Sequence, residues 1–308
     1  MIVGVSTAIR RALALAERYA RTRLPVLLVG ATGTGKELLA QHIHERSGRP
    51  GPLVDVNCCA LPRDMVESLL FGHRRGAFTG AVEANVGHVE RSDGGTLFLD
   101  ELASLASEAQ GKLLRVLETG EVQPLGATTK KRVDLRIVST VQDDIHTLVE
   151  SGRFRRDLFQ RAAGLVIDLP PLVARKEDVM PLAQHFAGLQ RQRLESGTES
   201  VLLAYPWPGN VRELRQVIER AGQLVTDGTL PSVALVEAIE LGAADGQPSG
   251  PVARHRRAIC ERVELISRCE AEGWDAARIA RGLGIHRATL FRRLKRAGIS
   301  LRQPAWSP

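Results

Sequence analysis

The sequence predicts an α/β fold, in which a parallel sheet with helices on both faces is followed by a helical lid and a small all-α helix-turn-helix domain. Three observations predict it. A glycine-rich loop of P-loop type, Gly30–Lys36, stands between a short apolar run and a helical stretch. Apolar runs of strand length alternate with amphipathic segments through residues 1–170. The remaining residues have helical periodicity only, and the last of them are strongly basic.

The positive charge is concentrated at the C-terminal end. The formal net charge is +7, and residues 251–308 hold 13 of the 42 Lys and Arg residues but only 5 of the 35 Asp and Glu residues. A basic segment on an otherwise balanced chain predicts nucleic acid as the partner of that segment alone.

Composition argues against export, membrane insertion and a zinc site. No apolar run approaches the length of a membrane span, and the N-terminus lacks the layout of a signal peptide. The four cysteines form no C-x-x-C pair, which predicts reduced thiols, and no H-E-x-x-H occurs. We therefore expect a cytoplasmic protein with no membrane contact.

The α/β part begins with a helix. Thr7–Ala20 carries apolar residues at helical spacing, and Val26–Val29 follows it as a buried strand. Beyond the P-loop and its helix the sequence predicts four more strands and two more helices. In chain order these are Leu53–Asn57, Asp64–Leu70, Thr96–Leu99, Leu105–Glu118, Leu135–Ser139 and Gly164–Asp168.

The lid is predicted to be helical throughout. Its helices are expected over Glu177–Gln192, Val211–Leu224 and Ser232–Ile239. Residues 242–251 are rich in Gly, Ala, Ser and Pro, which is typical of a flexible linker. The expected division is an α/β domain at 1–170, a lid at 171–241, a linker at 242–251 and a helix-turn-helix domain at 252–308.

The glycine-rich loop predicts a phosphate site for ATP. Glycines let the backbone curl so that several N–H groups point at an anion, and the start of the next helix adds its dipole. Lys36 supplies a full charge for the β- and γ-phosphates. A plain glycine turn, the alternative, does not account for the strand before the loop and the helix after it. The candidate nucleotide-binding residues are Gly30, Ala31, Thr32, Gly33, Thr34, Gly35, Lys36 and Glu37.

Two carboxylates end the apolar strand that starts at Thr96. In a P-loop protein a carboxylate at such a strand end holds Mg²⁺, and a second acid can polarise the attacking water. We assign Asp100 to the metal and Glu101 to the water. The alternative is a strand-to-helix cap with no chemistry.

A glycine-bounded loop over residues 76–81 carries an aromatic residue at its tip. It reads Gly-Ala-Phe-Thr-Gly-Ala. Physical chemistry alone predicts a turn whose Phe78 folds into the core.

Three of these motifs and a fourth stretch carry a family resemblance. They are the hexapeptide at 76–81, the P-loop in its Gly-Lys-Glu form, the Gly-Gly-Thr-Leu-Phe-Leu-Asp-Glu strand at 94–101, and Trp-Pro-Gly-Asn-Val-Arg-Glu-Leu at 207–214. Together they resemble the sigma-54-dependent transcriptional activators, the bacterial enhancer-binding proteins of the AAA+ class. The resemblance covers residues 2–240. Glu37 then fits the pattern, because the family looks the same at that position.

The resemblance implies a ring, usually a hexamer, with ATP bound between neighbouring subunits. The loop with Phe78 and Thr79 would contact sigma-54. Asn57 would be the polar switch that restrains Glu101 until nucleotide is sensed. By matched position, the further implied residues are Arg155 and Arg161 as arginine fingers, Arg212 as the second sensor in the lid, and Val3 in the segment that packs against adenine. A solvated basic face is the alternative for Arg155.

Other positions depart from the family pattern. Val141-Gln142 stands where the family usually has Thr-Asn. Val141 cannot donate a hydrogen bond, whereas Gln142 can. Residues 173–175 read Val-Ala-Arg instead of Arg-Glu-Arg, and the stretch from Phe186 to Tyr205 looks shorter than usual. These changes predict either slower or retuned hydrolysis or a degenerate ATPase.

The C-terminal segment predicts a helix over Trp274–Arg281, a glycine turn, and a second helix over Ile285–Ala297. This resembles the Fis-type domain that ends many of these activators, with a dimer-forming helix over residues 253–269. A basic hairpin that only packs on the lid is the alternative. We expect Ala288, Leu290, Phe291 and Leu294 to form the packed face of the second helix.

The second helix would lie in the major groove of double-stranded enhancer DNA. The candidate DNA-binding residues are His286, Arg287, Thr289, Arg292, Arg293 and Arg296.

We therefore expect an ATP-hydrolysing transcription activator that binds enhancer DNA and remodels the closed complex of the sigma-54 RNA polymerase holoenzyme. No regulatory domain is expected ahead of Ile2, so control would come from a regulatory protein in trans, expression level or DNA occupancy. One alternative is a DNA-binding regulator with a degenerate ATPase that uses nucleotide only for assembly. The other, an AAA+ helicase or chaperone, is opposed by the loop around Phe78 and by the helix-turn-helix.

Overall fold

The computed structural model describes residues 2–142, 145–245, 261, 265, 266, 268, 269, 272–297 and 299. The chain divides into two compact units. The first comprises Met1–Ile2 and Thr7–Pro171, and the second comprises Val3–Ser6 and Leu172–Pro308.

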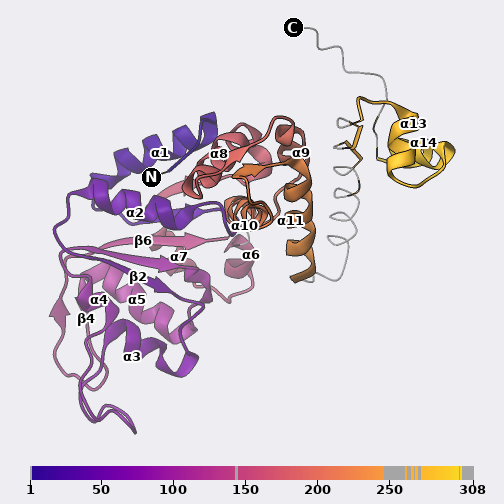
Figure 1. Ribbon diagram of the computed structural model, residues 1–308. Coiled ribbons are helices and arrows are strands. Elements are labelled where there is room, and N and C mark those ends of the chain that lie inside the picture. Colours follow the sequence, from indigo (N-terminus) through magenta and orange to yellow (C-terminus); the bar gives the residue numbers. More distant parts are fainter. Residues whose placement is uncertain are drawn as a thin grey trace. The chain divides into compact units, whose positions relative to one another are not determined.

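A five-stranded parallel sheet forms the centre of the first unit (Figure 1). Its strand order is β2-β3-β6-β1-β7, so β1 lies between β6 and β7. Because all five strands are parallel, their carboxyl ends meet at one edge, where ligands of open α/β sheets bind. The predicted parallel sheet is confirmed. Its strands are β1 (Val26–Val29), β2 (Leu53–Asn57), β3 (Thr96–Asp100), β6 (Arg136–Val141) and β7 (Leu165–Asp168).

Helices cover both faces of this sheet, as predicted (Figure 1). Successive strand residues point to opposite faces, so Leu28 packs in one apolar cluster and Leu27 in the other. The cluster around Leu28 is completed by α1 (Thr7–Ala20) and α2 (Lys36–Ser47). The cluster around Leu27 is completed by α3 (Val66–Phe71), α5 (Ser107–Thr119), α6 (Ile145–Glu150) and α7 (Arg156–Ala162).

Several short elements of the first unit were not predicted. β4 (Glu121–Val122) and β5 (Lys131–Arg132) form an antiparallel pair, and α4 (His88–Arg91) is a single turn. Short 3₁₀ turns occur at Arg63–Met65 and Leu102–Ser104. Elements of two to four residues are shorter than the window in which periodicity can be recognised.

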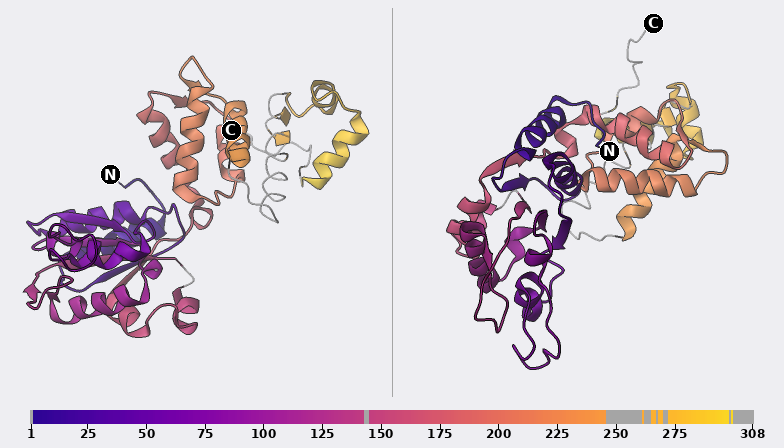
Figure 2. Two further views of the ribbon diagram at one scale, coloured as in Figure 1. Left: turned by 90° about the horizontal axis from the view of Figure 1, so that it is seen from below. Right: turned by 90° about the vertical axis from the view of Figure 1, so that its left-hand side faces the viewer.

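The second unit holds a helical lid in which α10 packs against α8 and α11 (Figure 2). The prediction of helices alone was wrong here, since β8 (Arg193–Leu194) and β9 (Thr229–Leu230) form a parallel pair. The predicted linker also starts too early, because α11 continues through the Gly-Ala-Ala-Asp sequence to Asp245. Residues 246–251 lie outside the described part. The helices are α8 (Val179–Leu189), α9 (Thr198–Ala204), α10 (Asn210–Gln223) and α11 (Ser232–Asp245).

Val3–Ser6 belongs to this second unit, not to the α/β unit that follows it in sequence. The buried carboxylate of Asp178 explains why. Its Oδ1 accepts the backbone N–H groups of Val5 and Ser6 at 2.6 and 2.7 Å, and its Oδ2 accepts the Ser6 hydroxyl at 2.6 Å. Arg175, 3.7 Å away, pairs with the same carboxylate.

Near the C-terminus, α13 (Ala276–Gly282) and α14 (Arg287–Arg296) are joined by a short turn, as predicted. Their shared core includes Leu290 and Leu294, which are four residues apart and lie on one helix face. The predicted packed face was half wrong, because Ala288 and Phe291 are exposed. They lie about 160° and 100° around the helix from Leu290.

Most of the predicted helix over 253–269 lies outside the described residues. In the part of the chain that the structure describes, no helix is both long and apolar enough to span a bilayer.

Candidate functional site

The P-loop curls tightly after β1. Gly30 has φ 151°, and a Cβ placed on it would lie 2.5 Å from the carbonyl oxygen of Leu169, so no other residue fits. Gly33 and Gly35 also have positive φ, at 79° and 105°. A Cβ on Gly35 would meet nothing within 4 Å, and Gly35 caps α2 with no side-chain hydrogen bond. The first N–H groups of α2 are therefore available to an anion.

The ammonium of Lys36 lies inside this curl. Its Nζ donates to the carbonyl oxygens of Gly30 at 2.6 Å and Ala31 at 3.1 Å, and the residue is only 8% exposed. The Thr34 hydroxyl donates to the same Ala31 carbonyl at 2.8 Å. A phosphate would give this buried ammonium a charge-assisted hydrogen bond, which is stronger than its hydrogen bonds to the two neutral carbonyls. The loop therefore fits a polyphosphate.

Asp100 and Glu101 stand where β3 ends, at the same edge of the sheet. Glu101 is in the left-handed conformation with φ 56°, which is strained for a residue with a side chain. Its backbone N–H donates to the hydroxyl of Thr140 at 2.8 Å, and that hydroxyl donates to Oδ1 of Asp100 at 2.6 Å. Thr140 thus holds both carboxylate residues in place from β6.

The side chain of Asn57 contacts Asp100 and not Glu101 in this structure, and the switch role that the resemblance implies for Asn57 stays a prediction. Asn57 Nδ2 lies 3.4 Å from Oδ2 of Asp100, its neighbour in strand register, and donates to it. Its Oδ1 accepts the backbone N–H groups of Cys59 and Ala60, which fixes the amide in the turn after β2. The amide that contacts Glu101 belongs to Gln142, whose Nε2 lies 3.1 Å from each carboxylate oxygen.

The carboxylates around Asp100 suit Mg²⁺ together with phosphate oxygens, not a metal held by protein alone. Asp55 is one of these carboxylates. Its pKa is raised by burial and, to a smaller extent, by the nearby charges of Glu37 and Asp100. Among the described residues, no three His, Cys, Asp or Glu side chains are grouped to hold a metal. Mg²⁺ in nucleotide sites takes one or two carboxylates and completes its shell with phosphates and water, so Asp100 fits the ion.

The two predicted arginine fingers have partners within the chain. Arg155 makes a forked pair with Asp157, at 3.0 and 2.7 Å. This hydrogen-bonded pair raises the pKa of Arg155 and lowers the pKa of Asp157. Arg161 donates through Nε and Nη2 to the carbonyl oxygen of Leu117, both at 3.3 Å. The pair with Asp157 uses two of the five N–H donors of the Arg155 guanidinium.

Phe78 lies at the tip of a hydrogen-bonded turn and is not folded into the core. Its side chain is 44% exposed and its ring contacts the His73 ring at an interplanar angle of 60°, with ring centroids 5.0 Å apart. Gly76 N–H donates to the Ala81 carbonyl at 2.8 Å, and Ala81 N–H donates to the Phe78 carbonyl at 3.0 Å. The turn therefore presents the aromatic residue on a defined scaffold.

The base of this turn is bonded to the segment between β4 and β5. Leu125 N–H donates to the Gly72 carbonyl and Arg74 N–H donates to the Leu125 carbonyl, both at 2.9 Å. A Cβ on Gly126 would lie 2.9 Å from the Cβ of Ala77, so only glycine allows this approach. The two loops thus form one assembly.

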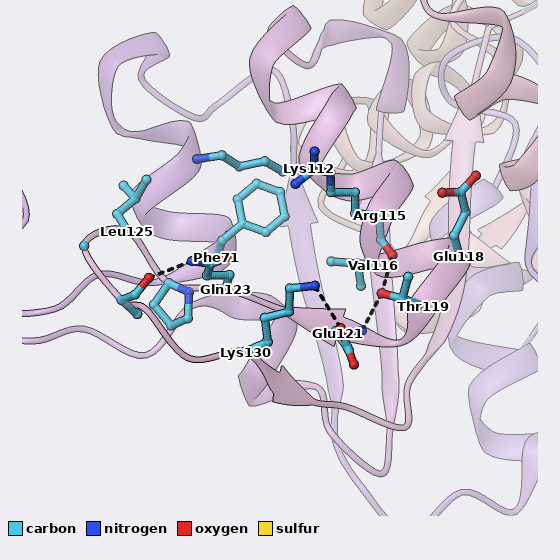
Figure 3. A pocket seen from close by; sticks show the side chains of 13 residues that line it. Phe71, Lys112, Arg115, Val116, Glu118, Thr119, Glu121, Gln123, Leu125 and Lys130 are labelled. Atoms are coloured by element: carbon cyan, nitrogen blue, oxygen red, sulfur yellow. Dashed lines mark hydrogen bonds and ion pairs between the residues drawn. The ribbon is translucent and has the colours of Figure 1, made fainter.

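A cavity of about 560 Å³ lies beside this assembly (Figure 3). Lys112 and Arg115 line it from α5, and Lys130 lines it from the segment between β4 and β5. Lys130 pairs with Glu121 at 3.3 Å. Gly126 also lines the cavity, so its wall is continuous with the loop that carries Phe78.

The other candidate residues lie in the second unit. Val3 packs against the apolar core of the lid, and Arg212 is exposed in the first turn of α10. Asn210, the first residue of α10, is buried with φ 55°, and its Oδ1 accepts the Leu172 N–H at 2.7 Å. The Trp-Pro-Gly-Asn motif therefore shapes the lid itself.

The candidate DNA-binding residues lie along α14. His286 caps the helix through Nδ1, which accepts the Ala288 N–H at 3.3 Å. Thr289 is half-buried, while the other candidates are exposed. The Arg287 guanidinium lies 5.9 Å from the Phe291 ring centroid, and Arg293 pairs with Glu261 at 3.7 Å. The exposed surface of α14 is therefore strongly basic.

The sequence prediction missed Thr140 and Asp178. A hydroxyl near the end of a strand neighbouring β3 was the signal for Thr140. Asp178 gave no signal, because its partners Val5 and Ser6 precede it by 173 and 172 residues.

Comparisons with known proteins place the chain in a family. Residues 2–168 match the family described as Sigma-54 interaction domain, and residues 174–250 match the AAA+ ATPase lid domain. The Nif-specific regulatory protein of Azotobacter vinelandii is 38% identical over 316 residues, which cover 98% of this chain and 60% of that protein. Transcriptional regulatory protein ZraR of Klebsiella oxytoca is 38% identical over 303 residues, which cover 96% of this chain and 68% of that protein.

A solved structure shows the same fold over nearly the whole chain. NtrX from Brucella abortus in complex with ATP superposes with a TM-score of 0.72 at 31% identity, over 97% of this chain and 70% of that one. The chain spans about 60% of the length of several curated relatives that it matches. Because the first family match alone covers more than half of the sequence, the chain belongs to the family of proteins with a sigma-54 interaction domain.

Proposed function

We propose that this protein is an ATP-hydrolysing transcription activator that acts on the sigma-54 RNA polymerase holoenzyme in the cytoplasm. One observation carries the proposal. A phosphate cradle with a buried Lys36 stands at the same sheet edge as Asp100 and Glu101, in a chain whose family is defined by interaction with sigma-54. The relatives named as regulators and the ATP complex of NtrX support it.

Each residue of the cradle has a proposed task in hydrolysis. The N–H groups of Gly33 to Lys36 and the Lys36 ammonium bind the β- and γ-phosphates. Mg²⁺, held by Asp100, supplies charge neutralisation for those phosphates. Glu101 accepts a proton from water as the water oxygen bonds to the γ-phosphorus. The bond from phosphorus to the bridging oxygen breaks, and ADP leaves with that electron pair.

The remaining parts serve output and targeting. We propose that Phe78 and Thr79 contact sigma-54, which explains an aromatic residue held exposed on a hydrogen-bonded turn. The basic surface of α14 would bind double-stranded enhancer DNA through the major groove. Arg155 and Arg161 would act as arginine fingers between neighbouring subunits of a homo-oligomeric ring. The roles in nucleotide binding implied for Val3 and Arg212 stay predictions.

A DNA-binding regulator with a degenerate ATPase is the second candidate. It is favoured by Val141, which is 1% exposed and apolar at a first-sensor position. It is opposed by the bonded set of Asp100, Glu101 and Thr140.

Turnover separates the two candidates. The wild-type protein should hydrolyse ATP in the presence of Mg²⁺, and Lys36→Ala should bind no nucleotide. Glu101→Gln should bind ATP with wild-type affinity but lose about 10²- to 10⁴-fold in kcat, because the water is no longer activated. A wild-type protein that binds ATP without turnover would favour the degenerate regulator. Wild-type turnover by Glu101→Gln would remove Glu101 from its assigned role.

A further inference from the structure

The helix α14 exposes one aromatic ring among basic side chains. Phe291 is 47% exposed, although Leu290 and Leu294 of the same helix are buried in the core that α14 shares with α13. Apart from Phe291 and Ala288, the exposed side chains of α14 are arginines and a lysine, and the helix contains no acidic residue. Its outer surface is therefore cationic with a single apolar area.

The Arg287 guanidinium lies close to this ring. Its Cζ is 5.9 Å from the ring centroid of Phe291, which is within the range of a cation–π contact, and the two residues are one helical turn apart. Among the described residues, the Arg287 guanidinium donates no hydrogen bond, so its five N–H donors are available to a ligand. The ring thus supports the guanidinium without occupying its donors.

The two flanks of α14 differ in their partners. At 100° per residue, Arg287 and Phe291 lie about 60° and 100° around the helix from Leu290 in one direction, and Arg293 lies about 60° in the other. Arg293 pairs with Glu261 at 3.7 Å, so its flank is directed toward an earlier part of the chain. On the flank with Phe291, Arg287 forms no ion pair with a described residue. That flank therefore suits a polyanion such as duplex DNA.

The major groove offers chemistry that matches both side chains. The apolar group that it presents is the C5-methyl of thymine, and guanine presents two acceptors that the fork of an arginine fits. The N-terminal residues of a recognition helix reach the base edges, and Arg287 is the first residue of α14. Base pairs stack about 3.4 Å apart, so two groups 5.9 Å apart reach bases within two base pairs of each other.

We propose that Phe291 determines sequence specificity by packing against the C5-methyl group of a thymine, within two base pairs of a guanine that Arg287 binds. The contact removes the methyl group and the exposed ring from water, and the ring holds the guanidinium in place for O6 and N7 of the guanine. A second copy of α14 is a poor occupant of this surface, because it would bring the same positive charge. This inference rests on the proposed DNA-binding role of α14 and names the feature of the DNA that the helix reads.

The test pairs a change in the DNA with a change in the protein. Duplexes that the full chain binds are selected from a pool of random sequences, and each thymine of the selected site is replaced singly by deoxyuridine, which lacks only the methyl group. At one thymine position the replacement should weaken binding by the wild-type protein about fourfold, the effect of one buried methyl group. Affinity is measured by fluorescence anisotropy at a single salt concentration, because salt itself weakens binding to DNA.

Phe291→Ala should remove the effect of the methyl group. This variant should bind the selected site less tightly than the wild-type protein and should bind the thymine and deoxyuridine duplexes equally well. Phe291→Leu keeps an apolar side chain and should restore part of the discrimination. Arg287→Ala should relax the preference for a guanine within two base pairs of the same thymine. Leu189→Ala removes an apolar side chain of α8 that is 67% exposed and should keep the fourfold discrimination.

Two results would overturn the inference. One is a selected site in which no thymine is sensitive to loss of its methyl group. The other is a sensitivity that persists in Phe291→Ala, because a different side chain would then contact the methyl group. A full chain that binds no DNA would remove the proposed DNA-binding role together with this inference, whereas a selected site without a methyl effect would remove this inference alone.

Discussion

The hydroxyl of Thr140 donates a hydrogen bond of 2.6 Å to the carboxylate of Asp100. The same oxygen accepts the backbone N–H of Glu101 at 2.8 Å. One fully buried side chain on β6 therefore fixes the carboxylate assigned to Mg²⁺ and the strained backbone of the residue assigned to water. The geometry of the candidate site depends on this hydroxyl as much as on the carboxylates.

Thr140→Val tests that dependence, because it removes the hydroxyl with little change in shape. A partly buried carboxylate oxygen and a partly buried backbone N–H lose their partner, so the free energy of unfolding should fall by about 1–3 kcal/mol. The Mg²⁺ concentration needed for half-maximal hydrolysis should rise. Thr140→Ser keeps the hydroxyl and is the control in both urea unfolding and the Mg²⁺ titration. Equal behaviour of the Val and Ser variants would show that the bond is unimportant.

Phe78→Ala should abolish the output step and spare the ATPase. The side chain is 44% exposed, so its loss should leave nucleotide binding and most hydrolysis intact. Co-sedimentation with purified sigma-54, in the presence of a γ-phosphate transition-state mimic, should be lost, and open-complex formation with it. Thr79→Ala should behave alike. Phe291→Ala removes an aromatic residue of similar exposure, 47%, on α14 and should retain sigma-54 binding. Full transcription by Phe78→Ala would exclude this loop as the output.

The arginine fingers predict that turnover depends on assembly. If Arg155 acts on a neighbouring subunit, specific ATPase activity should rise with protein concentration, and Arg155→Ala should cost roughly 10³-fold in kcat. Mixing that variant into the wild-type protein should reduce activity by more than dilution alone. Arg153→Ala removes an adjacent exposed arginine and is the control. Constant activity per subunit over a wide dilution range, together with a monomer in sedimentation, would contradict a ring.

The basic helix α14 predicts two kinds of DNA contact. A residue that reads a base, the role we give to Arg292, should cost about 1–3 kcal/mol on replacement by Ala and relax sequence preference. Arg296→Ala should weaken all sequences alike and flatten the dependence of affinity on salt. Arg215→Ala removes an exposed arginine of α10 and should change neither. Removal of residues 251–308 should abolish DNA binding and leave ATPase activity, so retained enhancer binding would exclude this assignment.

Two adjacent cysteines should differ sharply in reactivity. Burial raises the pKa of the Cys58 thiol to about 12, so it stays protonated and unreactive at pH 8. Cys59 is exposed beside Glu101. Iodoacetamide at pH 8, followed by peptide mapping, should modify Cys59 and spare Cys58 until the protein is denatured. Bound ATP analogue should slow the reaction of Cys59, and equal modification of both cysteines would contradict the buried position of Cys58.

The sequence predicted the sheet and the P-loop well, because these features rest on local signals. Each local feature can be recognised from about ten residues of sequence, as for the strand Val26–Val29, the glycine loop and the apolar strand before Asp100. The contacts of Asn57 could not be predicted, for the opposite reason. They depend on which of two amides faces one carboxylate, and Asn57 is taken up by its own turn.

Other errors arose where tertiary structure overrides local pattern. The Gly-Ala-Ala-Asp sequence after Leu241 reads as a linker, yet α11 includes it. The placement of Val3–Ser6 with the lid depends on Asp178, whose effect no window of sequence can contain. Phe291 was expected inside because it is apolar, although its angle around α14 directs it outward.

The main-chain bonds between Leu125 and the base of the Phe78 turn bear on how such proteins can be recombined. The Phe78 turn and the stretch with Leu125 and Gly126 are far apart in the sequence but form one structural part. Gly126 fits only against a residue as small as Ala77. A chimera that exchanged the hexapeptide alone between relatives would separate the two halves of that part. The functional module to exchange is the pair of loops, so substitutions at residues 72–81 and 123–127 should be tolerated together and not one at a time.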